Sequence, residues 1–174
     1  GAWDYVIVDG NLEADPWAKI KGYLDEGNIG FFGCTVMPGP QLKQAIPFTI
    51  KIREQYPDIK TVWGGYFASS QPAAALNSNA VDFIINGPGD KAFPALLEAL
   101  EAGMPVDGNH NLIYKSGSEI KMTVRDEIYD QDSLPEFPYA ALNEFYPIRK
   151  YLGKTCLGKN TIAYHSSFGC PFTC

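Results

Sequence analysis

Residues 60–66, Lys60-Thr61-Val62-Trp63-Gly64-Gly65-Tyr66, join a short strand-like run to a pair of glycines. Residues 60–63 are expected to form one of several strands of a parallel sheet, and this strand leads directly into the glycine pair. Glycine permits φ > 0 turns and lets a ligand approach the main chain closely. The stretch therefore predicts a buried strand whose carboxyl end is open to a ligand.

Strand-like and helix-like segments alternate along the first hundred residues. Strands are expected at residues 5–8, 29–36, 60–63 and 81–85. Helices are expected after Asp15-Pro16, over residues 41–55 and 72–76, and after Asp90, which can cap the last one. This βαβαβαβα order predicts an α/β fold, a Rossmann-like (flavodoxin-like) open parallel sheet with helices on both faces. Such a sheet binds its ligand beyond the carboxyl ends of its strands.

The pattern changes after Gly103. Residues 111–114 and 119–123 alternate weakly around Ser116-Gly117-Ser118, which predicts a β-hairpin. A proline-bearing connector follows, and residues 161–165 resemble one more strand. We expect a first domain over residues 1–105, a hairpin and linker over 106–158, and the start of another domain over 159–174.

Glycines and small polar residues gather at three successive strand ends. The candidate ligand-binding residues are Thr35, Val36, Met37, Gly39, Gly64, Gly65, Tyr66, Gly87, Gly89 and Asp90. Glycines at several strand ends favour a large, flat ligand lying across the sheet edge, whereas tight strand-to-helix turns are the plainer explanation. No segment matches G-x-G-x-x-G or the Walker A loop, so a nicotinamide oxidoreductase would lack its expected fingerprint.

The sequence closes on Gly169-Cys170-Pro171-Phe172-Thr173-Cys174. Closely spaced thiolates select iron–sulfur clusters, zinc or copper(I), so Cys170 and Cys174 are candidate metal ligands; a zinc knuckle is the alternative. The four cysteines of the chain are too scattered for a secreted disulfide framework, which favours a reducing cytoplasm. We expect Cys34, which sits in an apolar run, to be a core residue.

Composition narrows the class of protein. The chain has 174 residues, 45% hydrophobic residues and a formal net charge of −6, with no cluster of lysine and arginine. Nucleic-acid binding needs clustered positive charge, so a nucleic-acid partner is not expected. No apolar stretch reaches the roughly 20 residues that span a bilayer. The sequence starts with neither methionine nor a signal-peptide pattern, and we expect the natural N-terminus to be missing.

In their order and spacing, these motifs resemble the cobalamin-binding domain of cobalamin-dependent radical S-adenosylmethionine enzymes. The resemblance rests on residues 33–41, on Trp63-Gly64-Gly65-Tyr66 and on residues 81–93. Residues 132–139 resemble the connector to the radical domain, and residues 167–174 resemble the start of its Cys-x-x-x-Cys-x-x-Cys loop. By this resemblance the first strand and helix of the domain are missing.

The resemblance implies three cofactors. Cobalamin would lie on the ten candidate residues, and Cys170 and Cys174 would hold a [4Fe-4S] cluster with a third cysteine beyond the sequence. The cluster would cleave S-adenosylmethionine to a 5′-deoxyadenosyl radical, with methylcobalamin as methyl donor to a small-molecule substrate and flavodoxin or ferredoxin as electron donor. The resemblance implies that the parent is a radical S-adenosylmethionine enzyme and that its reaction is methyl transfer. The chain alone would be inactive, and the sequence does not identify its catalytic residues.

Some residues depart from the family pattern, and two other functions stay open. Thr35 replaces a serine, Pro88 and Asp90 replace two glutamates, and Phe168 replaces a common arginine. One alternative is a radical enzyme that performs ring formation or rearrangement. The other is a non-catalytic receiver-like or ligand-binding α/β module, for which Asp9 could serve as the phosphoacceptor.

Overall fold

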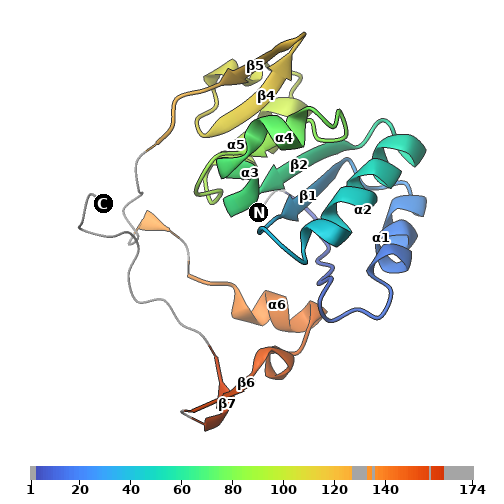
Figure 1. Cartoon of the computed structure of the whole chain (residues 1–174), viewed down its shortest axis with the longest axis vertical. Helices are drawn as coiled ribbons and strands as arrows, with labels where there is room; N and C mark the ends of the chain where they lie inside the picture. Colours follow the sequence, from blue (N-terminus) through green and yellow to red (C-terminus); the bar gives the residue numbers. More distant parts are fainter. Residues whose placement is uncertain (1–2, 127–132, 135, 157, 163–174) are drawn as a thin grey trace. The chain divides into compact units, whose positions relative to one another are not determined.

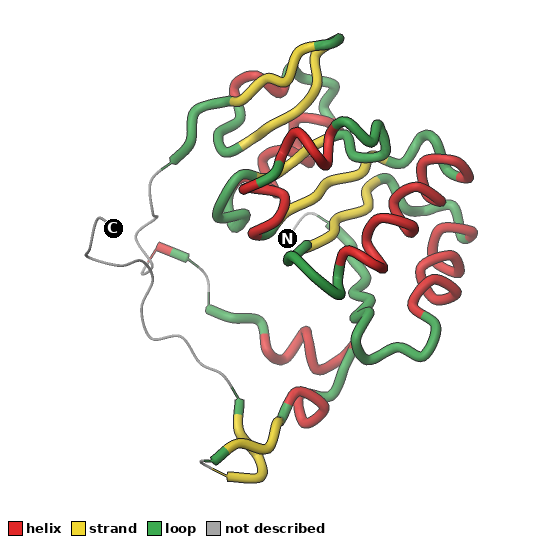
Figure 2. The backbone as a smooth tube through the Cα atoms, viewed as in Figure 1, coloured by secondary structure: helices red, strands yellow, loops and turns green. Residues whose placement is uncertain are grey.

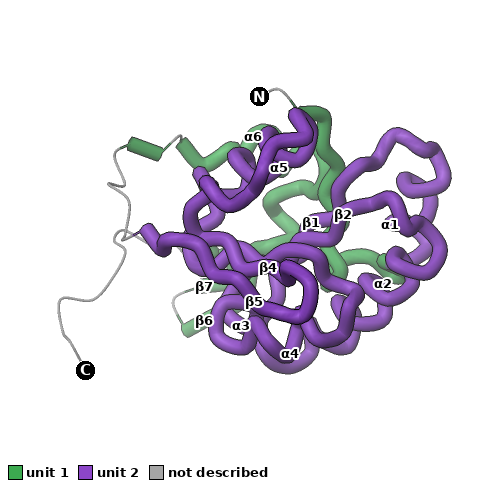
Figure 3. The backbone as a smooth tube through the Cα atoms, turned by 90° about the horizontal axis from the view of Figure 1, so that it is seen from above, with its two compact units in different colours: residues 1–16, 128–174 green, residues 17–127 purple. Residues whose placement is uncertain are grey.

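The computed structural model describes residues 3–126, 133–134, 136–156 and 158–162. The chain divides into two compact units, which Figure 3 colours separately. The larger unit is Trp17–Glu127, and the smaller unit combines Gly1–Pro16 with Ile128–Cys174. The predicted domain boundaries at residues 105 and 158 stay predictions.

The helices and strands follow one another as in Figure 1. Helix α1 (Pro16–Asp25) leads into the larger unit, which continues with β1 (Phe31–Thr35), α2 (Leu42–Gln55), β2 (Lys60–Gly64), α3 (Tyr66–Ser70), α4 (Pro72–Leu76), β3 (Phe83–Ile85), α5 (Ala92–Glu101), the 3-10 turn η1 (Val106–Gly108), β4 (Leu112–Ser116) and β5 (Glu119–Met122). The smaller unit contains α6 (Tyr139–Phe145), the 3-10 turn η3 (Ile148–Tyr151), β6 (Gly153–Thr155) and β7 (Gly158–Thr161).

The sheet of the larger unit is mixed, with the strand order β1-β2-β3-β4-β5 (Figure 2). Strands β1, β2 and β3 are parallel, as the sequence predicts. Strand β4 pairs antiparallel with β3, and β5 pairs antiparallel with β4. The predicted hairpin is therefore confirmed, but it extends the same sheet, and the prediction of a wholly parallel sheet is corrected.

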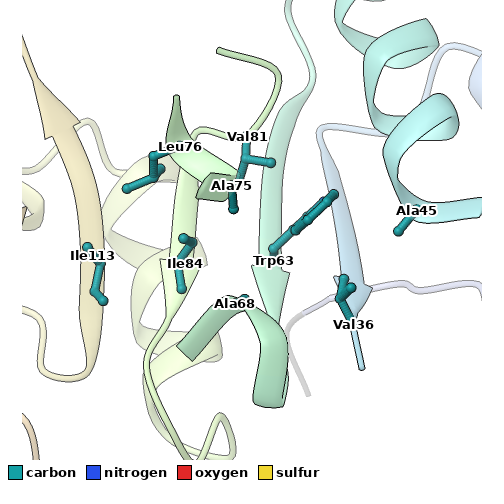
Figure 4. Close-up of a cluster of buried hydrophobic side chains, with 9 residues drawn as sticks. All are labelled: Val36, Ala45, Trp63, Ala68, Ala75, Leu76, Val81, Ile84 and Ile113. Carbon is teal, nitrogen blue, oxygen red and sulfur yellow. The ribbon is translucent and has the colours of Figure 1, made fainter. Parts of the chain in front are cut away.

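Helices cover both faces of this sheet, as predicted. On one face, Trp63 lies in a buried cluster with residues of α2, α3 and α4 (Figure 4). Its indole Nε1 donates to Thr49 Oγ1 at 3.0 Å, which satisfies the one polar atom of the ring. On the other face, Leu96 of α5 packs with Val62, Ile85 and Leu112. Each fully buried Leu, Ile or Val side chain contributes about 1.5–3 kcal/mol to folding.

A polar cluster closes the amino ends of β2 and β3. The Asp82 carboxylate accepts from the Thr61 backbone N–H at 2.8 Å and lies 2.5 Å from Arg53 Nη2 of α2. The Thr61 hydroxyl donates to the Ala80 carbonyl at 2.6 Å. Thr61 is fully buried, so these partners replace the water that its polar groups lose on folding.

One predicted strand is corrected, and another lies mostly outside the described residues. Residues 5–8 form no strand, because they belong to the smaller unit, where Tyr5 lies 5.7 Å from the ring of Phe145 rather than beside a strand. Of the strand predicted over residues 161–165, only the first two residues are described. Thr161 ends β7, which pairs with β6 in a small hairpin, so the expected barrel strand is not observed in the described part.

Tyrosine hydroxyls hold the smaller unit together. Tyr146, which is 3% exposed, donates to Glu13 Oε1 at 2.6 Å and accepts from the Asp9 backbone N–H at 3.1 Å. Tyr151 donates to Asp9 Oδ2 at 2.8 Å. Burial first, and then the hydrogen bond to Asp9, raise the pKa of Tyr151 to about 12. The Tyr151 phenol therefore stays a protonated donor at neutral pH.

No helix in the described ranges is both long and apolar enough to cross a membrane.

Candidate functional site

The three parallel strands bring the candidate residues to one edge of the sheet. Thr35 ends β1, Gly64 ends β2, and Ile85 ends β3 directly before the Asn86-Gly87 loop. Thr35 lies beside Gly64 in the β1–β2 register. Parallel neighbours end on the same side, so this carboxyl edge collects all three candidate loops.

Helix α3 ties the three strand ends together. Its Phe67 N–H donates to the Val36 carbonyl at 3.1 Å, next to the end of β1. At the other side, the Ser69 hydroxyl lies 3.4 Å from the Ile85 carbonyl and accepts from the Gly87 N–H at 3.0 Å. The candidate loops are thus fixed relative to one another by one short helix that the sequence pattern did not predict.

Position 65 requires a glycine, because its backbone packs closely against the backbone of Val36. It adopts φ +87°, and a Cβ placed there would lie 2.9 Å from the Val36 carbonyl oxygen and 3.0 Å from the Val36 nitrogen. A side chain at this position would collide with backbone that cannot move aside. The role of Gly65 is therefore to let β2 turn closely over the end of β1.

Gly64, the neighbouring residue, faces open space instead. A Cβ added to Gly64 would meet no atom within 4 Å, and the same holds for Gly39 in the β1–α2 loop. Close by in the chain, Met37 after β1 is 46% exposed and Tyr66 at the start of α3 is 66% exposed. Large apolar side chains at the rim of an open backbone surface suit contact with the face of a flat ligand.

A hydrogen bond to the Gln41 side chain holds the β1–α2 loop. The Gln41 carbonyl Oε1 accepts from the Met37 N–H at 2.8 Å, which fixes the backbone that follows Thr35. Thr35 itself is exposed and presents a hydroxyl at the edge. Val36 is fully buried in the cluster around Trp63, so its side chain faces the core rather than the edge.

The β3–α5 loop carries the last three candidates. Gly87 has φ +99°, and Gly89 accepts the Phe93 N–H at 2.9 Å through its carbonyl. Asp90 is exposed and does not cap α5, because the N-cap residue is Lys91 and makes no side-chain cap hydrogen bond. The predicted capping role of Asp90 is therefore corrected.

Cys34 lies next to this edge but is chemically inert at neutral pH. It packs against the cluster around Trp63, and burial raises the pKa of its thiol to about 11. A buried thiol of this kind stays protonated and is a weak nucleophile. Cys34 is only partly buried, so it lies at the border of the core and not within it as predicted.

Two polar residues at the edge were missed in the sequence. Asn111, which is 1% exposed and has φ +57°, accepts the Asn86 N–H through its carbonyl and donates its own N–H to the Val124 carbonyl, both at 2.8 Å. It thereby connects the β3 loop with the end of the hairpin. The second residue is Arg125, which comes directly after Val124 and whose side chain lies against Gly87.

A separate apolar hollow of about 210 Å³ lies between α2 and α4. Ile46, Ile50 and Ala74 line it together with Trp63 and Thr49. The Thr49 hydroxyl is engaged, because it donates to the Ala45 carbonyl at 2.7 Å and accepts from Trp63. The hollow thus offers little polar recognition, in contrast to the edge.

The candidate metal ligands and the candidate phosphoacceptor are not found at this edge among the described residues. Cys170 and Cys174 lie outside the described residues, and the described ranges contain no group of three residues suited to hold a metal ion. Asp9 is described and does not end a strand; its carboxylate accepts from Tyr151 and from the Asn11 N–H at 2.9 Å. It therefore lacks the position that a receiver-like phosphoacceptor needs.

Comparison with known proteins relates the chain by fold alone. No family model and no curated protein sequence matches it. Among solved structures, the radical S-adenosylmethionine methyltransferase TsrM from Kitasatospora setae, with tryptophan substrate and a SAM analogue bound, matches 64% of this chain with 21% identity and a TM-score of 0.56. The cobalamin-dependent S-adenosylmethionine radical enzyme OxsB with aqua-cobalamin bound matches 76% with 20% identity and a TM-score of 0.62.

A second structure of OxsB, with aqua-cobalamin and S-adenosylmethionine bound, gives the same coverage and TM-score at 19% identity. The match spans 22% of the TsrM chain and 19% of the OxsB chain. The chain is thus similar in fold to the cobalamin-binding portion of cobalamin-dependent radical S-adenosylmethionine enzymes.

Proposed function

We propose that the larger unit holds cobalamin at the carboxyl edge of β1, β2 and β3. The observation that carries this proposal is Gly64, where the backbone lies open and an added Cβ would meet no protein atom within 4 Å. Exposed Met37 follows the end of β1, and exposed Tyr66 begins α3 two residues after Gly64. The similarity in fold to OxsB with aqua-cobalamin bound supports the same choice of ligand.

The residues at the edge fit a corrin ring. A corrin is broad and flat, so it needs a protein surface without protruding side chains, and Gly39 and Gly64 provide such a surface. The Thr35 hydroxyl can donate a hydrogen bond to a side-chain amide of the corrin, while Met37 and Tyr66 can pack on its apolar rim. When bound, cobalamin would supply a methyl group for transfer to a substrate.

We further propose that the parent protein is a radical S-adenosylmethionine enzyme. Its [4Fe-4S] cluster would be held by Cys170, Cys174 and a third cysteine, as the sequence pattern predicts. Methyl transfer is the reaction that we favour, because TsrM is a methyltransferase of similar fold. A small-molecule substrate, a flavodoxin or ferredoxin as electron donor and a cytoplasmic location complete this proposal.

The test is binding of hydroxocobalamin, followed by its absorption spectrum. The wild-type chain is expected to bind one equivalent. The Gly64→Val variant should weaken binding at least about tenfold, since overpacking a close contact costs about 1–3 kcal/mol. Gly30→Val is the matched control, because an added Cβ at Gly30, as at Gly64, meets no atom within 4 Å, but Gly30 precedes β1 at the opposite end.

The two variants separate a binding defect from a folding defect. Urea unfolding should give similar midpoints for both, and only Gly64→Val should lose affinity. The proposal is wrong if the wild-type chain does not bind cobalamin, or if both variants bind as tightly as the wild type.

A further inference from the structure

An arginine side chain borders the glycine edge at its β3 end. A Cβ placed on Gly87 would lie 3.7 Å from both Nε and Nη2 of Arg125. The guanidinium therefore rests directly on the bare backbone of Gly87. The residue is exposed, so this group is accessible to a ligand that lies across the edge.

Hydrogen bonds through Asn111 hold Arg125 in this place. The Asn111 side-chain Oδ1 accepts from the Asp126 N–H at 2.7 Å, and its backbone N–H donates to the Val124 carbonyl at 2.8 Å. The Asn111 carbonyl accepts from the Asn86 N–H at 2.8 Å, next to Gly87. One buried residue thus fixes both the segment that carries Arg125 and the loop on which its side chain rests.

The charge of Arg125 is not neutralised within the described part of the chain. The structure gives the guanidinium no ion pair and no hydrogen bond there. The adjacent acid, Asp126, is engaged by His110, whose Nδ1 lies 2.5 Å from Asp126 Oδ1. The first turn of α5, which follows the Gly87 loop, contains no acidic residue. The β3 end of the edge therefore presents a guanidinium that is unpaired among the described residues, while the nearby acid Asp90 is exposed in the same β3–α5 loop.

We propose that Arg125 binds the phosphate of the nucleotide loop of the corrinoid. This inference rests on the proposed function of the edge. A guanidinium offers two parallel N–H donors to a phosphate, and such charge-assisted bonds are stronger than neutral ones. Arg125 would thereby make the site select a complete corrinoid, which carries the phosphate, over a corrinoid that lacks the nucleotide loop.

The test measures the dissociation constants of hydroxocobalamin and of aquocobinamide, which has the same corrin but no phosphate. The variants are Arg125→Met, which keeps much of the aliphatic length, and Arg125→Lys, which keeps the charge. Lys121→Met is the control, since Lys121 is an exposed cation within β5. Unfolding midpoints confirm that all variants are folded.

Arg125→Met is expected to weaken cobalamin binding about tenfold or more and cobinamide binding less than twofold. Arg125→Lys should retain part of the discrimination, and Lys121→Met all of it. Cobinamide also lacks the nucleotide base. The base contributes equally to wild type and variant, so it cancels when the cobinamide-to-cobalamin ratio of dissociation constants is compared between the two proteins.

Two failures are distinguishable. If the wild type binds both corrinoids and Arg125→Met changes both affinities equally, or neither, Arg125 does not contact the phosphate and the proposed function stands. If the wild type binds neither corrinoid, the proposed function fails, and the inference fails with it.

Discussion

The two ends of the same parallel strands are built in opposite ways. At the amino ends, Asp82 joins Arg53 and the buried Thr61 in a closed set of hydrogen bonds and an ion pair. At the carboxyl ends, Gly64 lies open and Tyr66 is 66% exposed. Polar side chains are used for stability where the sheet is closed, and bare backbone is left where a ligand can bind. Both edges contribute to stability, and the open backbone at the carboxyl ends is the feature on which the proposed binding site rests.

The largest expected effect on the free energy of unfolding comes from a substitution at the carboxyl edge. Gly65→Ala should lower the free energy of unfolding by about 3–4 kcal/mol, because the left-handed backbone and the contact with Val36 each cost about 1–3 kcal/mol. Gly64→Ala is the matched control, and it should cost less than about 0.5 kcal/mol, since its Cβ meets no neighbour. Urea unfolding measures both, and equal losses would contradict the close packing assigned to Gly65.

The next effect tests the amino edge. Asp82→Ala should lower the free energy of unfolding by about 2–3 kcal/mol, because it leaves buried Thr61 groups and Arg53 without their acceptor. Asp58→Ala, at an exposed acid just before β2, should change it by less than about 0.5 kcal/mol.

The same variant also sharpens the comparison between the edges. Cobalamin affinity of folded Asp82→Ala, measured well below its unfolding midpoint, should stay within twofold of the wild type. A large loss of affinity would show that the two edges are not independent.

The smallest effect concerns Cys34, which lies on β1 beside the carboxyl edge. Because burial raises its pKa to about 11, only about one thiol in a thousand is ionised at pH 8. Alkylation by iodoacetamide should therefore be slow at pH 8 and should accelerate about tenfold per pH unit as the pH rises towards 11. Exposed Cys156 is the internal comparison in peptide mass spectrometry. Fast labelling of Cys34 at pH 8 would show that the edge opens to solvent.

The sequence predicted the elements whose residues carry a strong local pattern. The helix over residues 72–76 matches α4, and the strands at 29–36 and 81–85 contain β1 and β3. Apolar runs and proline or glycine boundaries mark such elements without reference to the rest of the fold. The alignment of the three glycine-bearing strand ends followed from the parallel order alone.

Other features depend on contacts that local pattern does not encode. Residues 5–8 have the composition of a strand, but a strand exists only beside a partner, and their neighbour is Phe145. Helix α3 is fixed by bonds to Val36, Ile85 and Gly87 rather than by its own composition. The role of Arg125 depends on the antiparallel return of β5, which carries it to the carboxyl edge.

The tyrosine bonds of the smaller unit have a consequence for the order of folding during synthesis. Asp9 donates its N–H to Tyr146, 137 residues later in the chain, so this contact of the smaller unit cannot form until Tyr146 has been made. The larger unit, Trp17–Glu127, is complete before that point and can fold first. A folded insert shortens the effective loop between Asp9 and Tyr146, which lowers the entropy cost of bringing them together. The hydrogen bond between Asp9 and Tyr146 thus forms after the larger unit has had time to fold.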